Sequence, residues 1–97
     1  MKIVLTIAGS DSISGAGVQQ DLKVFSAMNV YGVSVITAVT SQNTRGIISI
    51  HPIPPEVISD QIDAVFSDIQ PDAVKTGMLY SSETVKMVIK KMKISIP

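Results

Sequence analysis

Runs of β-branched residues alternate along the chain with segments whose apolar residues recur at helical spacing, and this alternation most constrains the fold. The chain contains 14 Ile and 12 Val but only 3 Leu, which favours buried strands over a bundle of helices. Strands that alternate with helices join through right-handed crossovers into a mostly parallel sheet. The pattern therefore predicts a doubly wound α/β fold with helices on both faces of the sheet, and it argues against an all-α protein.

The same pattern gives approximate positions for each strand and helix. The β-branched runs predict strands over residues 3–8, 33–40, 47–53 and 73–78. The helical periods predict helices over residues 18–29 and 55–69, and a third that begins at Ser81 or Ser82. The first helix is expected to bury a stripe that includes Met28. The third is expected to bury Val85, Val88, Ile89 and Met92.

Length, charge and composition exclude several classes of protein and site. The 97 residues suit one small domain, and 8 basic residues balance 8 acidic ones, so we expect neither a nucleic acid nor a membrane as partner. The absence of cysteine excludes disulfides and thiolate metal sites, and His51 alone cannot form a metal site. The apolar run at residues 1–7 is far too short to span a membrane, so a cytoplasmic location is expected.

Polar or glycine-rich segments follow three of the predicted strands. These segments are residues 9–17, 40–46 and 77–78. Ligands of open α/β sheets bind beyond the carboxyl ends of the strands, so we expect the three segments to meet at one crevice. The first segment matches neither a Walker A loop nor the dinucleotide fingerprint, although its free backbone N–H groups suit an anion or a hydroxylated ligand.

Several side chains near this crevice have both a functional and a structural interpretation. Asp11 or Asp21 can direct a carboxylate into the crevice, but Asp21 also suits the first turn of a helix. Gln42 can bind the mixed donor and acceptor edge of an aminopyrimidine or an amide-like ligand, or it can stabilise a turn. Lys75 can face the ligand, although a lysine there is more often solvated. Met78 can contact an aromatic ring or fill the core.

Five motifs in order resemble those of the hydroxymethylpyrimidine/phosphomethylpyrimidine kinases of thiamine biosynthesis, a family of the ribokinase-like superfamily. They are Leu-Thr-Ile-Ala-Gly-Ser-Asp-Ser-Ile-Ser-Gly-Ala-Gly with Gln-Gln-Asp-Leu-Lys at 5–23, Tyr-Gly and Ser-Val-Ile-Thr-Ala at 31–38, Gln-Asn-Thr-Arg-Gly at 42–46, Pro-Pro-Glu at 54–56, and Lys-Thr-Gly-Met-Leu at 75–79. The resemblance implies a ribokinase-like fold. It also implies ATP-dependent, Mg²⁺-assisted phosphorylation of a hydroxymethylpyrimidine and then of its monophosphate.

The resemblance also implies which residues meet the small-molecule pyrimidine substrate. They are Gly9, Ala16, Asp21, Thr40, Gln42 and Met78. One departure lies in the first motif, where Ile13 and Ser14 replace residues that are small or glycine in the family.

The resemblance covers only the front part of the longer family members. Residues 1–97 are therefore expected to form one partial domain on the substrate side of the fold. The catalytic residue, the anion hole and most of the nucleotide pocket are expected beyond Pro97, so the 97 residues alone are expected to be inactive and to self-associate. Two alternatives remain open at this stage: a pyridoxal or pyridoxine kinase, and a non-catalytic pyrimidine-binding or assembly module.

Overall fold

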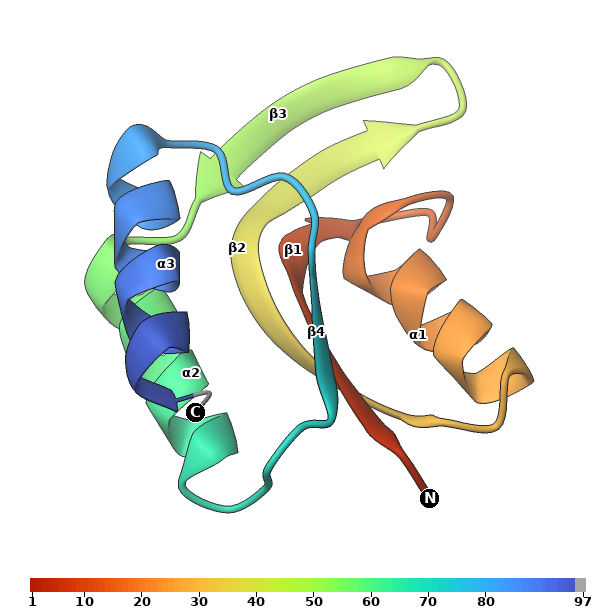
Figure 1. The fold of residues 1–97 in the computed structure, drawn as a ribbon. Coiled ribbons are helices and arrows are strands. Elements are labelled where there is room, and N and C mark those ends of the chain that lie inside the picture. The colour runs from red at the N-terminus through yellow and green to blue at the C-terminus, as the bar shows by residue number, and fades with distance from the viewer. Residues whose placement is uncertain (96–97) are drawn as a thin grey trace.

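A four-stranded sheet in the order β3-β2-β1-β4 forms the centre of the molecule. The computed structural model describes residues 1–95, and Figure 1 shows the path of the chain through the sheet and three helices. In chain order the elements are β1 (Ile3–Asp11), α1 (Gly17–Ala27), β2 (Tyr31–Asn43), β3 (Gly46–Pro52), α2 (Pro55–Phe66), β4 (Ala73–Thr76) and α3 (Ser82–Ser95). The predicted α/β fold is confirmed.

The sheet is mixed because β2 and β3, at one edge, form an antiparallel hairpin. β1 pairs in parallel with both β2 and β4, whereas β3 runs antiparallel to β2. The predicted polar loop over residues 40–46 was wrong in part, since β2 continues to Asn43 and only Thr44 and Arg45 connect it to β3. Cross-strand pairing of Gln42 with Ile47 satisfies backbone groups that a loop would leave to water.

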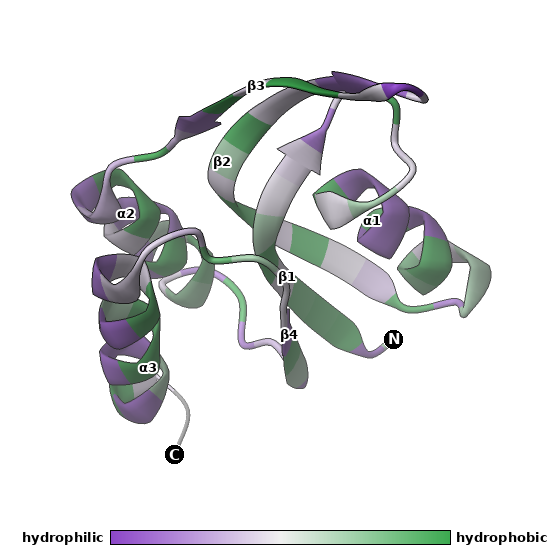
Figure 2. Ribbon diagram, turned by 90° about the horizontal axis from the view of Figure 1, so that it is seen from above, coloured by the Kyte–Doolittle hydropathy of each residue, from purple (hydrophilic) through white to green (hydrophobic). Residues whose placement is uncertain are grey.

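Helices cover both faces of the sheet, as the alternation of elements predicts. α1 lies on one face, and α2 and α3 lie side by side on the other (Figure 1). The strands of Figure 2 carry long hydrophobic stretches, whereas its helices alternate between hydrophobic and hydrophilic residues. The buried core lies between β1, β2, α2 and α3 and consists of Leu5, Ile7, Val35, Ile58, Ile62 and Val88. Each of these side chains contributes about 1.5 to 3 kcal/mol when fully buried.

Two of the predicted buried stripes were wrong in part. Met28 is 67% exposed, because α1 ends at Ala27 and the chain turns away at Asn29, which has a φ of 59°. α3 buries Val88, but Val85 and Ile89 are exposed because α3 packs on α2 with only one side. Within residues 1–95, no helix has the length and apolar character that crossing a membrane requires.

Candidate functional site

A pocket of about 280 Å³ opens at the carboxyl ends of β1, β2 and β4. The three segments that follow these strands therefore meet, as predicted from the sequence. Five of the six expected site residues line the pocket, and they are Gly9, Ala16, Thr40, Gln42 and Met78. The sixth, Asp21, is not among the lining residues. The other lining residues are Ala8, Ser10, Asp11, Gly17, Ile47, Lys75, Gly77 and Tyr80.

Asp11 organises the loop between β1 and α1. Its carboxylate accepts hydrogen bonds from the backbone N–H groups of Ile13 at 3.0 Å and Ala16 at 2.9 Å. The Ile13 N–H is the main reason that the pKa of Asp11 is lowered, and burial of the carboxyl group opposes this effect in part. The Asp11 carboxylate, which was a candidate ligand-binding group from the sequence, is thus already bound to backbone groups of its own loop.

The two departures from the family motif leave this turn intact. Ser14 adopts the left-handed conformation with a φ of 65°, and its N–H donates to the carbonyl of Asp11 at 3.1 Å. Ile13 is 46% exposed and is not among the residues that line the pocket. A serine therefore occupies a backbone geometry that favours glycine, while the larger side chain lies outside the pocket.

The rim near β2 is held to the first loop by hydroxyl groups. Ser12 Oγ accepts a hydrogen bond from the N–H of Gln42 at 2.9 Å and donates to the carbonyl of the same residue. Thr40 is buried, and its hydroxyl donates to the carbonyl of Ser10 at 2.6 Å. These contacts fix the backbone of Gln42, which lines the pocket, and the Gln42 side chain also helps to lower the pKa of Asp11 by hydrogen bonding to its carboxylate.

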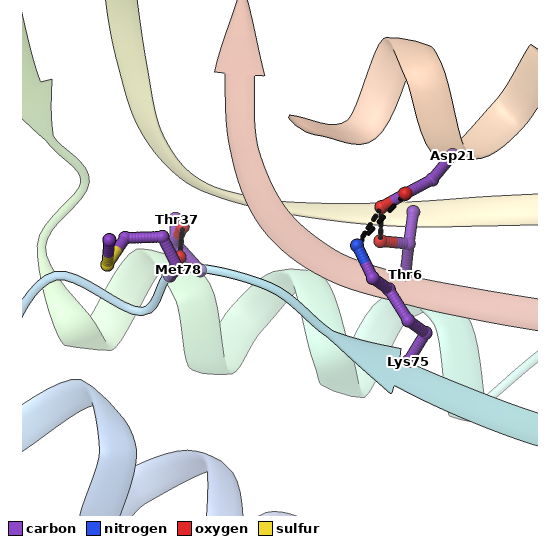
Figure 3. A network of polar contacts seen from close by, with 5 residues as sticks. All are labelled: Thr6, Asp21, Thr37, Lys75 and Met78. Carbon is purple, nitrogen blue, oxygen red and sulfur yellow. Dashed lines mark hydrogen bonds and ion pairs between the residues drawn. The ribbon is translucent and has the colours of Figure 1, made fainter. Parts of the chain in front are cut away.

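The segment after β4 forms the opposite wall. The buried hydroxyl of Thr37 donates to the carbonyl of Met78 at 2.9 Å and so fixes the backbone of this pocket-lining residue (Figure 3). Tyr80 was missed by the sequence reasoning. Its φ is 72°, and a Cβ atom at Gly9 would lie only 2.6 Å from the Tyr80 hydroxyl oxygen. No sequence signal places this tyrosine on Gly9, because the contact depends on the turn that follows β4.

Asp21 lies behind the pocket wall, where it binds Lys75. Lys75 Nζ is 2.9 Å from Oδ1 and 2.8 Å from Oδ2 of Asp21, and the hydroxyl of Thr6 donates to Oδ2 at 2.6 Å (Figure 3). The three residues come from α1, β4 and β1. Lys75, which sequence reasoning took as more often solvated, is exposed and also lines the pocket.

The described residues offer little to a metal ion or a nucleotide. No group of three or more His, Cys, Asp or Glu side chains gathers among residues 1–95 in a way that could hold a metal. Asp11 and Asp21 both have their carboxylates engaged by protein donors. We therefore assign none of the described side chains to Mg²⁺ or ATP.

Comparison with known proteins gives the family of the chain. Residues 11–96 match the family model described as phosphomethylpyrimidine kinase. The hydroxymethylpyrimidine/phosphomethylpyrimidine kinase of Bacillus subtilis is 53% identical over 88 residues, which cover 91% of this chain and 32% of that relative. The crystal structure of phosphomethylpyrimidine kinase from Clostridium difficile matches with a TM-score of 0.96 and 49% identity, over 100% of this chain and 42% of that one.

Pyridoxal kinases have the same fold. The structure of the Staphylococcus aureus pyridoxal kinase in complex with AMP-PCP and pyridoxal matches with a TM-score of 0.88 and 39% identity, over 99% of this chain and 36% of that one. The chain spans about a third of the Bacillus subtilis relative and a smaller share of bifunctional thiamine-biosynthesis relatives. Since the family model matches most of its residues, the chain belongs to the phosphomethylpyrimidine kinase family.

Proposed function

We propose that this chain forms the substrate-binding part of an ATP-dependent kinase of thiamine biosynthesis. Its substrates are 4-amino-5-hydroxymethyl-2-methylpyrimidine and the monophosphate of that compound. The observation that carries the proposal is that five of the six residues expected from the family resemblance line one pocket. The family membership and the high identity to named kinases of these two substrates support it.

The pocket has the size and chemistry for one substituted pyrimidine ring. Its volume of about 280 Å³ lies just below the usual range for ligand pockets, about 300 to 1,000 Å³, which suits a ligand with a single ring. Gln42 offers an amide with both donors and an acceptor to the aminopyrimidine edge, and Met78 and Ala16 offer apolar contact to the ring. Gly9 and Thr40 complete the proposed site. Asp21 does not line the pocket, and it is part of the site because its carboxylate binds the ammonium group of Lys75, which does.

The role of these residues in the reaction is to bind and orient the acceptor. The hydroxymethyl oxygen attacks the γ-phosphorus of ATP, a new P–O bond forms, and the bond to the ADP oxygen breaks. In the second reaction a phosphate oxygen of the monophosphate is the nucleophile. We propose that Mg²⁺, which would neutralise charge on the phosphates, and ATP bind through other parts of the complete domain, which also supply the catalytic residue.

A pyridoxal kinase is the second candidate, favoured by the match to the pyridoxal-bound Staphylococcus aureus enzyme. The identity is 39% to that enzyme and 53% to the Bacillus subtilis pyrimidine kinase, so we place pyridoxal second. A non-catalytic pyrimidine-binding module would keep the pocket but lack turnover.

We also propose a cytoplasmic location, where ATP is available, and self-association of the chain.

A coupled assay of ADP release tests the proposed function. The full-length product of the encoding gene is expected to phosphorylate hydroxymethylpyrimidine and its monophosphate with ATP and Mg²⁺, more efficiently than pyridoxal. Residues 1–97 alone are expected to show no turnover, because phosphoryl transfer depends on groups that position and neutralise the transferred phosphate. A full-length product that binds the pyrimidine without turnover would support the binding module instead. Steady turnover by residues 1–97 would contradict the assignment of catalysis to other parts of the domain.

A further inference from the structure

We propose that Lys75 contacts the substrate in this pocket and that Asp21 is the residue that positions it. The inference rests on the proposed function, because it concerns how the same pocket holds its heteroaromatic ligand. Lys75 would donate a hydrogen bond from Nζ to an acceptor atom of the ligand, either a ring nitrogen or the hydroxyl oxygen. Asp21 would hold the ammonium group at the pocket wall without contacting the ligand.

The geometry of the ion pair supports this division of roles. Lys75 lines the pocket with a side chain that is 48% exposed, whereas the side chain of Asp21 is 15% exposed and lies behind it. The fully buried Thr6 donates to Oδ2 of Asp21 at 2.6 Å, so the carboxylate is held from β1 as well as by the ammonium group. Figure 3 shows the Lys75 side chain extending from β4 towards Asp21 on α1.

A glycine gives the ammonium group its place beside the pocket. A Cβ atom at Gly77 would lie 3.6 Å from Lys75 Nζ and 2.8 Å from the Cβ atom of Ala8. Gly77 and Ala8 both line the pocket. Lys75 Nζ therefore lies next to the bare backbone of Gly77 at the pocket wall, and a larger residue at position 77 would crowd Ala8.

Counting donors and acceptors shows which partner is available to a ligand. An ammonium group carries three N–H donors, and the two oxygens of Asp21 engage at most two of them in well-aligned bonds, which leaves one donor for another acceptor. Lys75 is the one positively charged side chain among the described residues that line the pocket. Partly exposed ion pairs contribute little to stability, so stability alone does not account for this arrangement.

Calorimetry with matched ligand analogues tests the contact. The full-length gene product and its Lys75→Met variant are titrated with hydroxymethylpyrimidine, with two analogues in which C–H replaces one ring nitrogen, and with the analogue that lacks the hydroxyl group. Lys75→Met is expected to bind hydroxymethylpyrimidine about 10- to 100-fold more weakly. One of the three analogues lacks the atom that accepts the hydrogen bond from Lys75. The variant and the wild type are expected to bind that analogue with equal affinity.

Lys91→Met is the matched control, because Lys91 forms a similar ion pair with Asp63 at 2.8 Å on the other side of the sheet. It is expected to bind every compound as the wild type does. If a folded Lys75→Met variant bound hydroxymethylpyrimidine with unchanged affinity, the inference would be overturned but the proposed function would stand. Equal losses for hydroxymethylpyrimidine and all three analogues would also overturn it. A wild type that binds none of the compounds would instead contradict the proposed function, and the inference with it.

The role of Asp21 is tested by asking whether the effects of the Asp21 and Lys75 substitutions on ligand affinity add. Asp21→Asn is expected to weaken binding in the wild type and to have no further effect in the Lys75→Met background, since Asp21 acts through Lys75. An equal loss in both backgrounds would contradict the positioning role. A measurement without substitutions covers the case of an unfolded variant: with ¹⁵N-labelled lysine, the Nζ resonance of Lys75 should shift on binding while that of Lys91 should not. An unmoved Lys75 resonance at saturation would overturn the proposal.

Discussion

Ser12 Oγ accepts a hydrogen bond from the N–H of Gln42 at 2.9 Å and donates one to the carbonyl of the same residue. One hydroxyl group thereby joins the loop after β1 to the end of β2, which are 30 residues apart in the chain. Gln42 lines the pocket, and Ser12 holds its backbone in place. The affinity of the pocket should therefore depend on a residue that does not line it.

Ser12→Ala removes both hydrogen bonds to Gln42. We expect the affinity for hydroxymethylpyrimidine to fall about fivefold, the equivalent of about 1 kcal/mol, because Gln42 is then less well positioned. Calorimetry measures the change. Ser67→Ala is the control, since within the described residues the Ser67 hydroxyl bonds only to the carbonyl of Ala64 at the end of α2. Equal affinities of Ser12→Ala and wild type would show that Ser12 does not position Gln42.

Gly17→Ala should destabilise the fold by more than about 2 kcal/mol. Gly17 has a φ of +66°, and a Cβ atom there would lie 2.3 Å from the backbone oxygen of Gly9. Gly15→Ala is the matched control, because its Cβ atom would make an ordinary contact of 3.5 Å with Asp11, and we expect a change within about 0.5 kcal/mol. Urea unfolding measures both variants. Equal stability of the two would contradict this description of the first loop.

Acidification should loosen the loop that Asp11 organises. The folded-state pKa of Asp11 is lowered relative to its ordinary value, so its ionised form stabilises the fold. That contribution is complete above the ordinary value of about 3.9 and is lost as the pH falls through the lower folded-state pKa. The difference in unfolding free energy between wild type and Asp11→Asn should therefore shrink with falling pH. Asp60→Asn, at an exposed position on α2, serves as control. A difference that stays constant down to pH ~2 would refute the role of Asp11.

Most of the fold could be predicted from local sequence patterns. The four β-branched runs and three helical periods appear as β1 to β4 and α1 to α3, with ends shifted by a few residues. The antiparallel hairpin was harder to predict, because residues 41–46 are polar and their strand conformation comes from pairing with β3. The exposure of Val85 and Ile89 could not be predicted either, since periodicity identifies an apolar stripe on a helix but not which element covers that stripe.

The pocket could be predicted in outline but not in its details. The carboxyl ends of parallel strands share an edge, which was enough to bring Gly9, Gln42 and Met78 together. The ion pair of Asp21 with Lys75 joins residues 54 positions apart, and only the register of β4 on β1 shows that they meet. The contact of Tyr80 with Gly9 likewise depends on the turn after β4.

Residues 1–97 should self-associate in solution. Within the described residues β4 pairs only with β1, so its other edge is open. Val85 and Ile89, which are 39% and 51% exposed, line a shared apolar groove with Thr76 of β4. Open edges next to apolar surface favour further pairing. Light scattering should therefore give a mass above that of the monomer, and Ile89→Lys should lower it. Val24→Lys is the control, because Val24 is 42% exposed on α1 and lies on neither edge strand of the sheet. A monodisperse wild-type monomer would contradict this prediction.

Calorimetry of the full-length gene product with hydroxymethylpyrimidine and with pyridoxal tests the central claim most directly. We predict tighter binding of hydroxymethylpyrimidine, and a loss on the order of 1 to 3 kcal/mol for Gln42→Ala, which removes a hydrogen bond to the ring. Gln70→Ala, at an exposed position after α2, should bind as the wild type does. Tighter binding of pyridoxal, or an unchanged affinity of Gln42→Ala for the pyrimidine, would contradict the assignment of this pocket.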